Sequence, residues 1–326
     1  NESPIKLNNE VIRFVEFPAV DSIKFESLYS GVFNEPYEML YEAGHLLMRC
    51  KHSLSEEFLF DYSILDDTVN SKGISYGMAP NEMLSCDISR LNDKIWVYDI
   101  GKQRIGFLSI DSIWNGNYSI EKYYNVPRYF YSVAMLNDSI MIGTNDVTES
   151  KKLSFLNLYT GQIEGKASYA YLNEKIPNSA LIDAASCYIN IHPITKDIVL
   201  AYRYMDILEF YDCNGVLKYS IQGPENIELK FAVNSSNTMK KIPQTRKAYV
   251  SSYITNDKVY LLYSGCKRIE DNWSNGMELH VYSWNGEPLN CYLLEEPLYA
   301  FAINELGSEI YSYSLQTGEI IKGCLK

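Results

Sequence analysis

The chain has 326 residues, of which 46% are hydrophobic and 21% are charged, and its formal net charge is −12. A chain of this length and composition can bury a large core, as one large all-β domain or as two ordinary ones. The negative charge argues against nucleic acid or an anionic membrane surface as a partner, because both require clustered cations. No apolar stretch approaches the roughly 18–20 residues that a membrane-spanning helix needs.

Two further features of the composition concern location and fold. The chain begins with Asn1 rather than Met, as expected if a leader segment has been removed. Its seven cysteines include no C-x-x-C pair, so we expect mostly buried thiols. Its 28 tyrosines suit half-buried strands, where the ring packs on the sheet and the hydroxyl reaches solvent.

The dominant pattern along the chain is a short apolar run that follows a polar turn and recurs six times. The runs begin at Leu46, Ile95, Ile140, Ile198, Val259 and Ile310. The intervals between them are 49, 45, 58, 61 and 51 residues. A period of about 40–50 residues built from short strands is typical of a β-propeller blade. The sequence therefore predicts an all-β fold, a six-bladed β-propeller.

The repeats also predict where the blades begin and end within one domain, 1–326. The six blades are expected at about 37–75, 84–124, 130–172, 186–222, 248–294 and 298–326. Hairpin turns are predicted where a polar residue precedes glycine, at Asn115–Gly116, Thr160–Gly161, Asn214–Gly215 and Asn285–Gly286.

The last blade is short, because only 16 residues follow Ile310. The N-terminal segment contains a strand-like run, Val11–Phe17, outside any repeat. An unclosed blade would leave an exposed sheet edge. We therefore predict that an N-terminal strand at about 10–17 completes the last blade and closes the ring.

Two of the intervals are long because the chain carries insertions. The first, around Tyr169–Asp183, separates blades three and four, and the second, Gly223–Lys247, separates blades four and five. The second is polar and shows no strand pattern. It carries five basic residues, Lys230, Lys240, Lys241, Arg246 and Lys247.

Three features together resemble the TolB-like six-bladed propellers. They are the repeat phase, the turn Gly77–Met83 before blade two, and the final segment with Ile310-Tyr311 and Ile320-Ile321-Lys322. Within that family the likeness is to exported lipoproteins common in Bacteroidetes. The resemblance implies a propeller fold and an extracytoplasmic location, in the periplasm or as an outer-membrane lipoprotein. It implies no catalytic residues, since that group has no established activity.

The sequence contains no convincing catalytic motif. Gly73–Gly77 fits the G-x-S-x-G pattern of serine hydrolases, but Pro80 follows and no helical periodicity supports the strand-to-helix turn that this motif requires. The four histidines lack the spacing of a metal site. They are His45, His52, His192 and His280. Histidines from different blades can still meet in a channel, so a metal-dependent hydrolase, lactonase or lyase remains the alternative function.

Propeller topology places the connections between blades, and those between the second and third strands, at one face around the channel mouth. Aromatic and cationic side chains on such loops are typical of a binding surface. The candidate ligand-binding residues are Arg49, Asp99, Tyr124, Arg128, Tyr129, Arg203 and Tyr204.

These observations favour a non-catalytic, monomeric binding protein of the cell envelope over an enzyme. Its expected partner is a small molecule, a glycan or an envelope protein. We expect no nucleic acid, no cofactor and no metal, and membrane attachment only through a lipid anchor preceding the chain.

Overall fold

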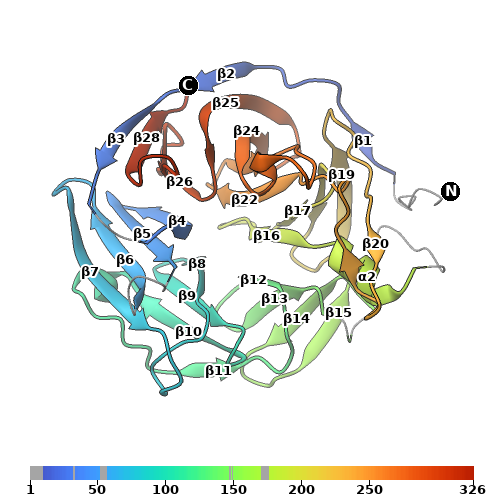
Figure 1. Ribbon diagram of the computed structural model, residues 1–326. Helices are drawn as coiled ribbons and strands as arrows, with labels where there is room; N and C mark the ends of the chain where they lie inside the picture. The colour runs from blue at the N-terminus through green and yellow to red at the C-terminus, as the bar shows by residue number, and fades with distance from the viewer. Residues whose placement is uncertain (1–9, 32–33, 52–56, 147, 149, 170–175) are drawn as a thin grey trace. The chain divides into compact units, whose positions relative to one another are not determined.

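The computed structural model describes residues 10–31, 34–51, 57–146, 148, 150–169 and 176–326. Within these residues the strands form six sheets of four or five strands and one two-stranded sheet. In each larger sheet four neighbouring strands form a propeller blade, and three or four of them follow one another in chain order. The predicted all-β, six-bladed β-propeller is confirmed, and Figure 1 colours its blades along the chain.

The blades fall into two compact units, which we describe separately. The first unit draws on residues 1–22, 130–157 and 162–294 and holds three blades. Blade three consists of β12 (Ser132–Met135), β13 (Ile140–Thr144), β14 (Leu153–Asn157) and β15 (Ile163–Lys166). Blade four consists of β16 (Cys187–Ile191), β17 (Ile198–Tyr202), β18 (Ile207–Tyr211) and β19 (Leu217–Gln222). Blade five consists of β22 (Tyr249–Ile254), β23 (Lys258–Tyr263), β24 (Gly276–Ser283) and β25 (Pro288–Leu298).

The second unit draws on residues 23–129, 158–161 and 295–326. Blade one consists of β4 (Pro36–Glu42), β5 (His45–Cys50), β6 (Glu57–Ser63) and β7 (Thr68–Ser75). Blade two consists of β8 (Asp87–Leu91), β9 (Lys94–Asp99), β10 (Arg104–Ser109) and β11 (Tyr123–Asn125). Blade six consists of β26 (Phe301–Ile303), β27 (Glu309–Tyr313), β28 (Ile320–Cys324) and β3 (Phe25–Tyr29).

The last blade is completed by an N-terminal strand, as predicted, but the residues differ. The closing strand is β3, in which Phe25 pairs with Gly323 and Tyr29 with Ile320. The predicted location at about 10–17 is wrong: β1 (Ile12–Arg13) instead runs parallel to β19. A further strand, β2 (Val20–Ile23), lies beside β25. The N-terminal segment thus adds strands to three successive blades.

The predicted hairpin at Asn115–Gly116 is also wrong. A short helix, α1 (Ile110–Trp114), follows β10, and Asn115 is its C-cap. Gly116 has a φ of 72°, the left-handed conformation that commonly ends a helix. The other three polar-glycine pairs do join the third and fourth strands of their blades.

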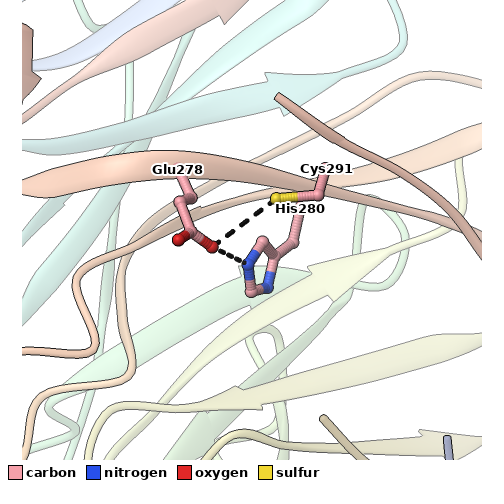
Figure 2. Close-up of side chains that lie close together, drawn as sticks. All are labelled: Glu278, His280 and Cys291. Carbon is pink, nitrogen blue, oxygen red and sulfur yellow. Dashed lines mark hydrogen bonds and ion pairs between the residues drawn. The ribbon is translucent and has the colours of Figure 1, made fainter. Parts of the chain in front are cut away.

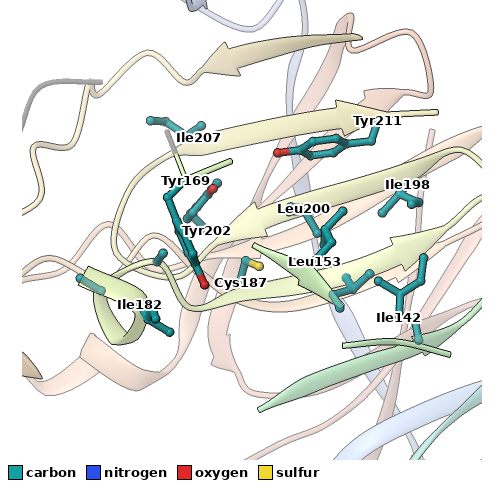
Figure 3. Packing of buried hydrophobic residues seen from close by; sticks show 14 of the residues in the cluster. Ile142, Leu153, Tyr169, Ile182, Cys187, Ile198, Leu200, Tyr202, Ile207 and Tyr211 are labelled. Atoms are coloured by element: carbon teal, nitrogen blue, oxygen red, sulfur yellow. The ribbon is translucent and has the colours of Figure 1, made fainter. Parts of the chain in front are cut away.

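Apolar side chains pack between neighbouring blades within each unit. Figure 3 shows part of the cluster between blades three and four, where Leu153 and Leu200 lie between their sheets. Ile182 joins this core from α2 (Asn178–Ala184), a helix within the first insertion. All seven cysteines are free thiols, and four of them are buried. Among the described residues no helix is long and apolar enough to cross a bilayer.

Candidate functional site

The connections between blades and those between second and third strands end at the same edge of each sheet, because neighbouring strands are antiparallel. In the first unit, this edge carries the β17–β18 connection with Arg203 and Tyr204. It also carries the second insertion with Lys241 and Lys247, and the β23–β24 connection, which contains the single-turn helix η1 (Asp271–Ser274). The long irregular segments of blades four and five therefore share one surface.

The two insertions pack against each other. The Ser179 hydroxyl in α2 donates to the carbonyl of Asn237 at 2.5 Å, and the Met239 amide donates to Asp183 Oδ2 at 3.2 Å. Asn237 and Met239 belong to a small hairpin formed by β20 (Ala232–Val233) and β21 (Met239–Lys240). The second insertion therefore contains two short strands, contrary to the prediction that it shows no strand pattern.

Backbone hydrogen bonds fix the three connections relative to one another. The Ala248 amide donates to the Arg203 carbonyl at 2.8 Å, and the Lys247 amide donates to the Cys266 carbonyl at 2.9 Å. The Arg268 amide donates to the Thr245 carbonyl at 2.9 Å. Side chains on these segments are therefore held by the scaffold, as a preorganised site requires.

A buried carboxylate anchors the start of the second insertion. Asp206 Oδ1 accepts the Ile227 amide at 2.8 Å, and the Asp206 carbonyl accepts the Gly223 amide at 2.7 Å. Burial raises the pKa of Asp206. A Cβ at Gly223 would lie 2.9 Å from Asp206 Oδ2, so glycine allows this close approach.

Two aromatic rings lie at the centre of the surface. The rings of Tyr204 and Trp273 are nearly parallel, with centroids 6.4 Å apart, and both side chains are buried. Lys247 Nζ lies 5.0 Å from each ring centroid, and Lys241 Nζ lies 5.8 Å from Tyr204 and 5.4 Å from Trp273. Arg268 Cζ lies 4.8 Å from the Trp273 centroid. Three cations thus surround two rings, within the range of cation–π attraction.

Arg203 occupies a second aromatic site beside them. Its Cζ lies 4.8 Å from the ring of Tyr131 and 4.5 Å from that of Tyr188. Its guanidinium donates to both hydroxyl groups, at 2.9 Å for Tyr188. We call Arg203, Tyr204, Lys241, Lys247, Arg268 and Trp273 the cationic-aromatic cluster.

The electrostatics of this cluster are unusual in a chain of net charge −12. Lys247 is only 8% exposed, and burial, followed by repulsion from Arg203 and Lys241, lowers its pKa well below the ordinary value. Burial and the charges of Arg268 and Arg203 also lower the pKa of Lys241, against the opposing effect of Asp183. Within the described part of the chain, no carboxylate forms an ion pair with Lys241, Lys247 or Arg268.

The structure places the predicted site residues in different environments. Arg203 and Tyr204 lie in the cationic-aromatic cluster. The other five belong to the second unit and are Arg49, Asp99, Tyr124, Arg128 and Tyr129.

Two of these five have clear structural roles. Asp99 is fully buried, and its carboxylate accepts the amides of Leu84, Ser85 and Lys102 at 3.1–3.2 Å. Arg49 forms ion pairs with Glu38 and Asp87, each at 3.3 Å. Both residues therefore hold loops and strands together, and neither is retained as a ligand-binding candidate.

The remaining three belong to an aromatic segment. Tyr124 packs edge-on against Tyr159, with centroids 5.4 Å apart. Tyr129 is 63% exposed, and Arg128 is half-buried. They remain predicted contact residues, and Lys122 Nζ lies 4.6 Å from the Tyr124 centroid and 6.0 Å from that of Tyr159.

Sequence reasoning missed Arg268 and Trp273. Both lie in the β23–β24 connection, which runs from 264 to 275 and is long for a loop within a blade. That length is the signal that could have identified them, since this connection shares an edge with the insertion.

A different group of side chains could in principle hold a metal ion. Figure 2 shows Glu278, His280 and Cys291, with His280 Nε2 and Cys291 Sγ at 2.8 Å and 3.5 Å from Glu278 Oε2. Burial raises the pKa of the Cys291 thiol to about 12. His280 Nδ1 is buried and has no hydrogen-bond partner in the described part of the chain, whereas a metal-bound imidazole normally donates this N–H to an acceptor. The residues fit a hydrogen-bonded triad better than a metal site.

The other histidines have partners of their own. His45 Nδ1 bonds Asp61 at 2.8 Å, and His192 Nδ1 accepts the amides of Ile194 and Thr195. His52 lies outside the described residues. None of these contacts brings two described histidines to a common ion.

Comparison with solved structures shows the same fold in distant proteins. A member of the DUF4221 family from Bacteroides vulgatus has a TM-score of 0.66 and 14% identity, covering 98% of this chain and 99% of its own. A predicted exported protein of Bacteroides fragilis has a TM-score of 0.62 and 10% identity, covering 97% and 99%. The β-propeller domain of Swd1 from Myceliophthora thermophila has a TM-score of 0.52 and 8% identity, covering 93% and 100%. At these identities the likeness concerns the fold alone.

The sequence itself carries a family signature. No curated protein matches it. The family described as "TolB-like 6-blade propeller-like" matches residues 13–306, which include strands of all six blades. The chain therefore belongs to the TolB-like family of six-bladed propellers.

Proposed function

We propose that this protein is a non-catalytic binding module of the bacterial cell envelope, and that the cationic-aromatic cluster is its binding surface. The observation that carries the proposal is the convergence of the second insertion and of the β17–β18 and β23–β24 connections on three basic side chains around two buried rings. These side chains are Lys241, Lys247 and Arg268. Residues on loops fixed by a rigid scaffold are the usual carriers of binding function. The expected partner is a small molecule, a glycan or an envelope protein.

The extracytoplasmic location rests on resemblance. The structurally similar Bacteroides fragilis protein is a predicted exported protein. A propeller provides rigid blades on which loop surfaces can diverge without loss of stability. An envelope binding protein is consistent with both observations.

Thermal unfolding against a panel of defined compounds tests this proposal. The panel contains glucose, maltotriose, glycine, a dipeptide, citrate, inorganic phosphate, glucose 6-phosphate and glucuronate. A ligand present at about 100 times its Kd stabilises a folded protein by about 2.7 kcal/mol. We expect at least one compound to raise Tm, with no change in the compound itself.

Two variants test whether the ligand binds at the cationic-aromatic cluster. Arg268→Ala and Tyr131→Ala alter exposed side chains at the cluster and beside it, and each should abolish the ligand-dependent rise in Tm. Lys218→Ala is the matched control, because Lys218 lies in β19 and pairs with Asp197 at 2.7 Å. A panel without any hit, or a hit unaffected by both cluster variants, contradicts the proposal.

A further inference from the structure

The charges of the cationic-aromatic cluster point to the class of ligand. Arg203, Lys241, Lys247 and Arg268 bring four positive charges together, and Asp183 is the carboxylate that acts on Lys241. Repulsion among cations costs free energy in the unliganded protein. A bound anion would remove this cost, whereas a neutral ligand would leave it in place.

Two donors at the cluster lack an acceptor among the described residues. The Lys247 side chain is more than nine-tenths buried, and no described residue accepts a hydrogen bond from its ammonium. The Trp273 Nε1–H is also buried without a partner among the described residues. Buried donors are normally satisfied by protein groups, by ordered water or by a bound ion. An oxyanion supplies several acceptors of the kind that both groups lack.

The protein also contains a lysine that shows the ordinary arrangement. Lys166 Nζ lies 4.5 Å from the ring centroid of Phe155. This resembles Lys247, whose Nζ lies 5.0 Å from the ring centroids of Tyr204 and Trp273. Glu164 neutralises Lys166 at 3.3 Å. A ring beside a lysine is thus common to both sites, and Lys247 differs from Lys166 in being buried without an ion pair among the described residues.

We propose that the cationic-aromatic cluster binds the oxyanion group, phosphate or carboxylate, of a small organic molecule. This inference rests on the proposed function and specifies its ligand class. Lys247 and Lys241 contact the oxyanion as point charges, and the rings of Tyr204 and Trp273 hold the two ammonium groups in place. Tyr131 is exposed and its ring contacts Arg203. This ring offers a surface on which the organic part of the ligand can pack.

Isothermal titration with glucose 6-phosphate, glucuronate, inorganic phosphate and neutral glucose tests this inference. We expect an anionic compound to bind and glucose not to bind. Increasing salt should weaken binding, because exposed charges are screened. Lys247→Met should weaken binding about tenfold or more, as expected for the loss of a charge-assisted contact. Lys166→Met, the matched control, should leave it within about twofold.

The affinities for glucose 6-phosphate and glucuronate show whether the site prefers a phosphate or a carboxylate. The affinity for inorganic phosphate shows whether the sugar ring contributes to binding. Lys241→Met provides a second test at an exposed position, should Lys247→Met fail to fold. Binding of an anion that both methionine variants leave unchanged overturns the inference. Glucose binding that is lost in Tyr131→Ala but insensitive to salt and to Lys247→Met also overturns it, while leaving the proposed function intact. A lack of any binding contradicts both.

Discussion

At the scale of single residues, the most consequential interaction within blades three and four is a buried ion pair. Lys152 and Glu209 are 2% and 1% exposed, and Lys152 Nζ lies 2.5 Å from Glu209 Oε2. The hydroxyls of Tyr202 and Tyr211 donate to the same oxygen, each at 2.7 Å. This network satisfies charges that would otherwise be costly to bury.

Removing one member of this pair should be strongly destabilising. We expect Lys152→Met to lower the free energy of unfolding by about 3–5 kcal/mol, because Glu209 would remain buried without its counter-charge. Lys152→Met/Glu209→Gln should recover a large part of that loss. Urea unfolding measures both, and equal stability of the single and double variants would contradict this account. Lys218→Met, at an exposed pair, should cost no more than about 1 kcal/mol.

Lys247 should affect stability in the opposite direction. Its lowered pKa means that the unfolded chain binds a proton more tightly than the folded protein. Stability should therefore rise with pH between the lowered pKa of Lys247 and the ordinary lysine value of about 10.4. Lys247→Met should stabilise the unliganded protein at neutral pH by about 1 kcal/mol and remove this rise. Destabilisation with an unchanged pH profile would contradict the prediction.

At the scale of elements, the contact between the insertions depends on Asp183. We expect Asp183→Ala to leave the Met239 amide without its acceptor and to cost about 1 kcal/mol. Amide hydrogen exchange should become faster at Met239 and Lys240, and the amides of β17 should be unaffected. Unchanged exchange in the β20–β21 hairpin would show that the insertions do not support each other.

The elements differ in how far the sequence predicts them. Each of the six apolar runs lies in the second strand of its blade, because that strand is buried on both faces and must be continuously apolar. In blade four, the run predicted to begin at Ile198 starts β17, and the predicted turn Asn214–Gly215 joins β18 to β19. The helix α1 was not predicted, since five residues are too few for a helical period to be visible.

The site was only partly predictable for a related reason. Topology identifies which loops share an edge, and so led to Arg203 and Tyr204. It does not show which side chains on that edge are neutralised locally. The amide hydrogen bonds to the Asp99 carboxylate and the ion pairs of Arg49 depend on contacts between segments distant in sequence. Arg268 and Trp273 required the β23–β24 connection to be recognised as long.

At the scale of the whole molecule, the N-terminal segment completes the sheets. Removal of residues 1–24 deletes β1 and β2 but keeps β3, whereas removal of residues 1–30 also strips β3 from blade six. We expect the longer deletion to expose the edge of β28 and to cause aggregation and a large loss of Tm. The shorter deletion should have a smaller effect. Thermal unfolding and gel filtration compare the two, and equal behaviour would contradict closure through β3.

The proposed anion site lies on a protein of net charge −12. The most direct test is the pKa of the Lys247 ammonium, measured by NMR on protein with labelled lysines, without and with glucose 6-phosphate. We predict that this pKa is low in the unliganded protein and rises when the phosphate binds, because an anion favours the charged form. A Lys247 pKa that stays unchanged at saturation with the ligand would contradict the account.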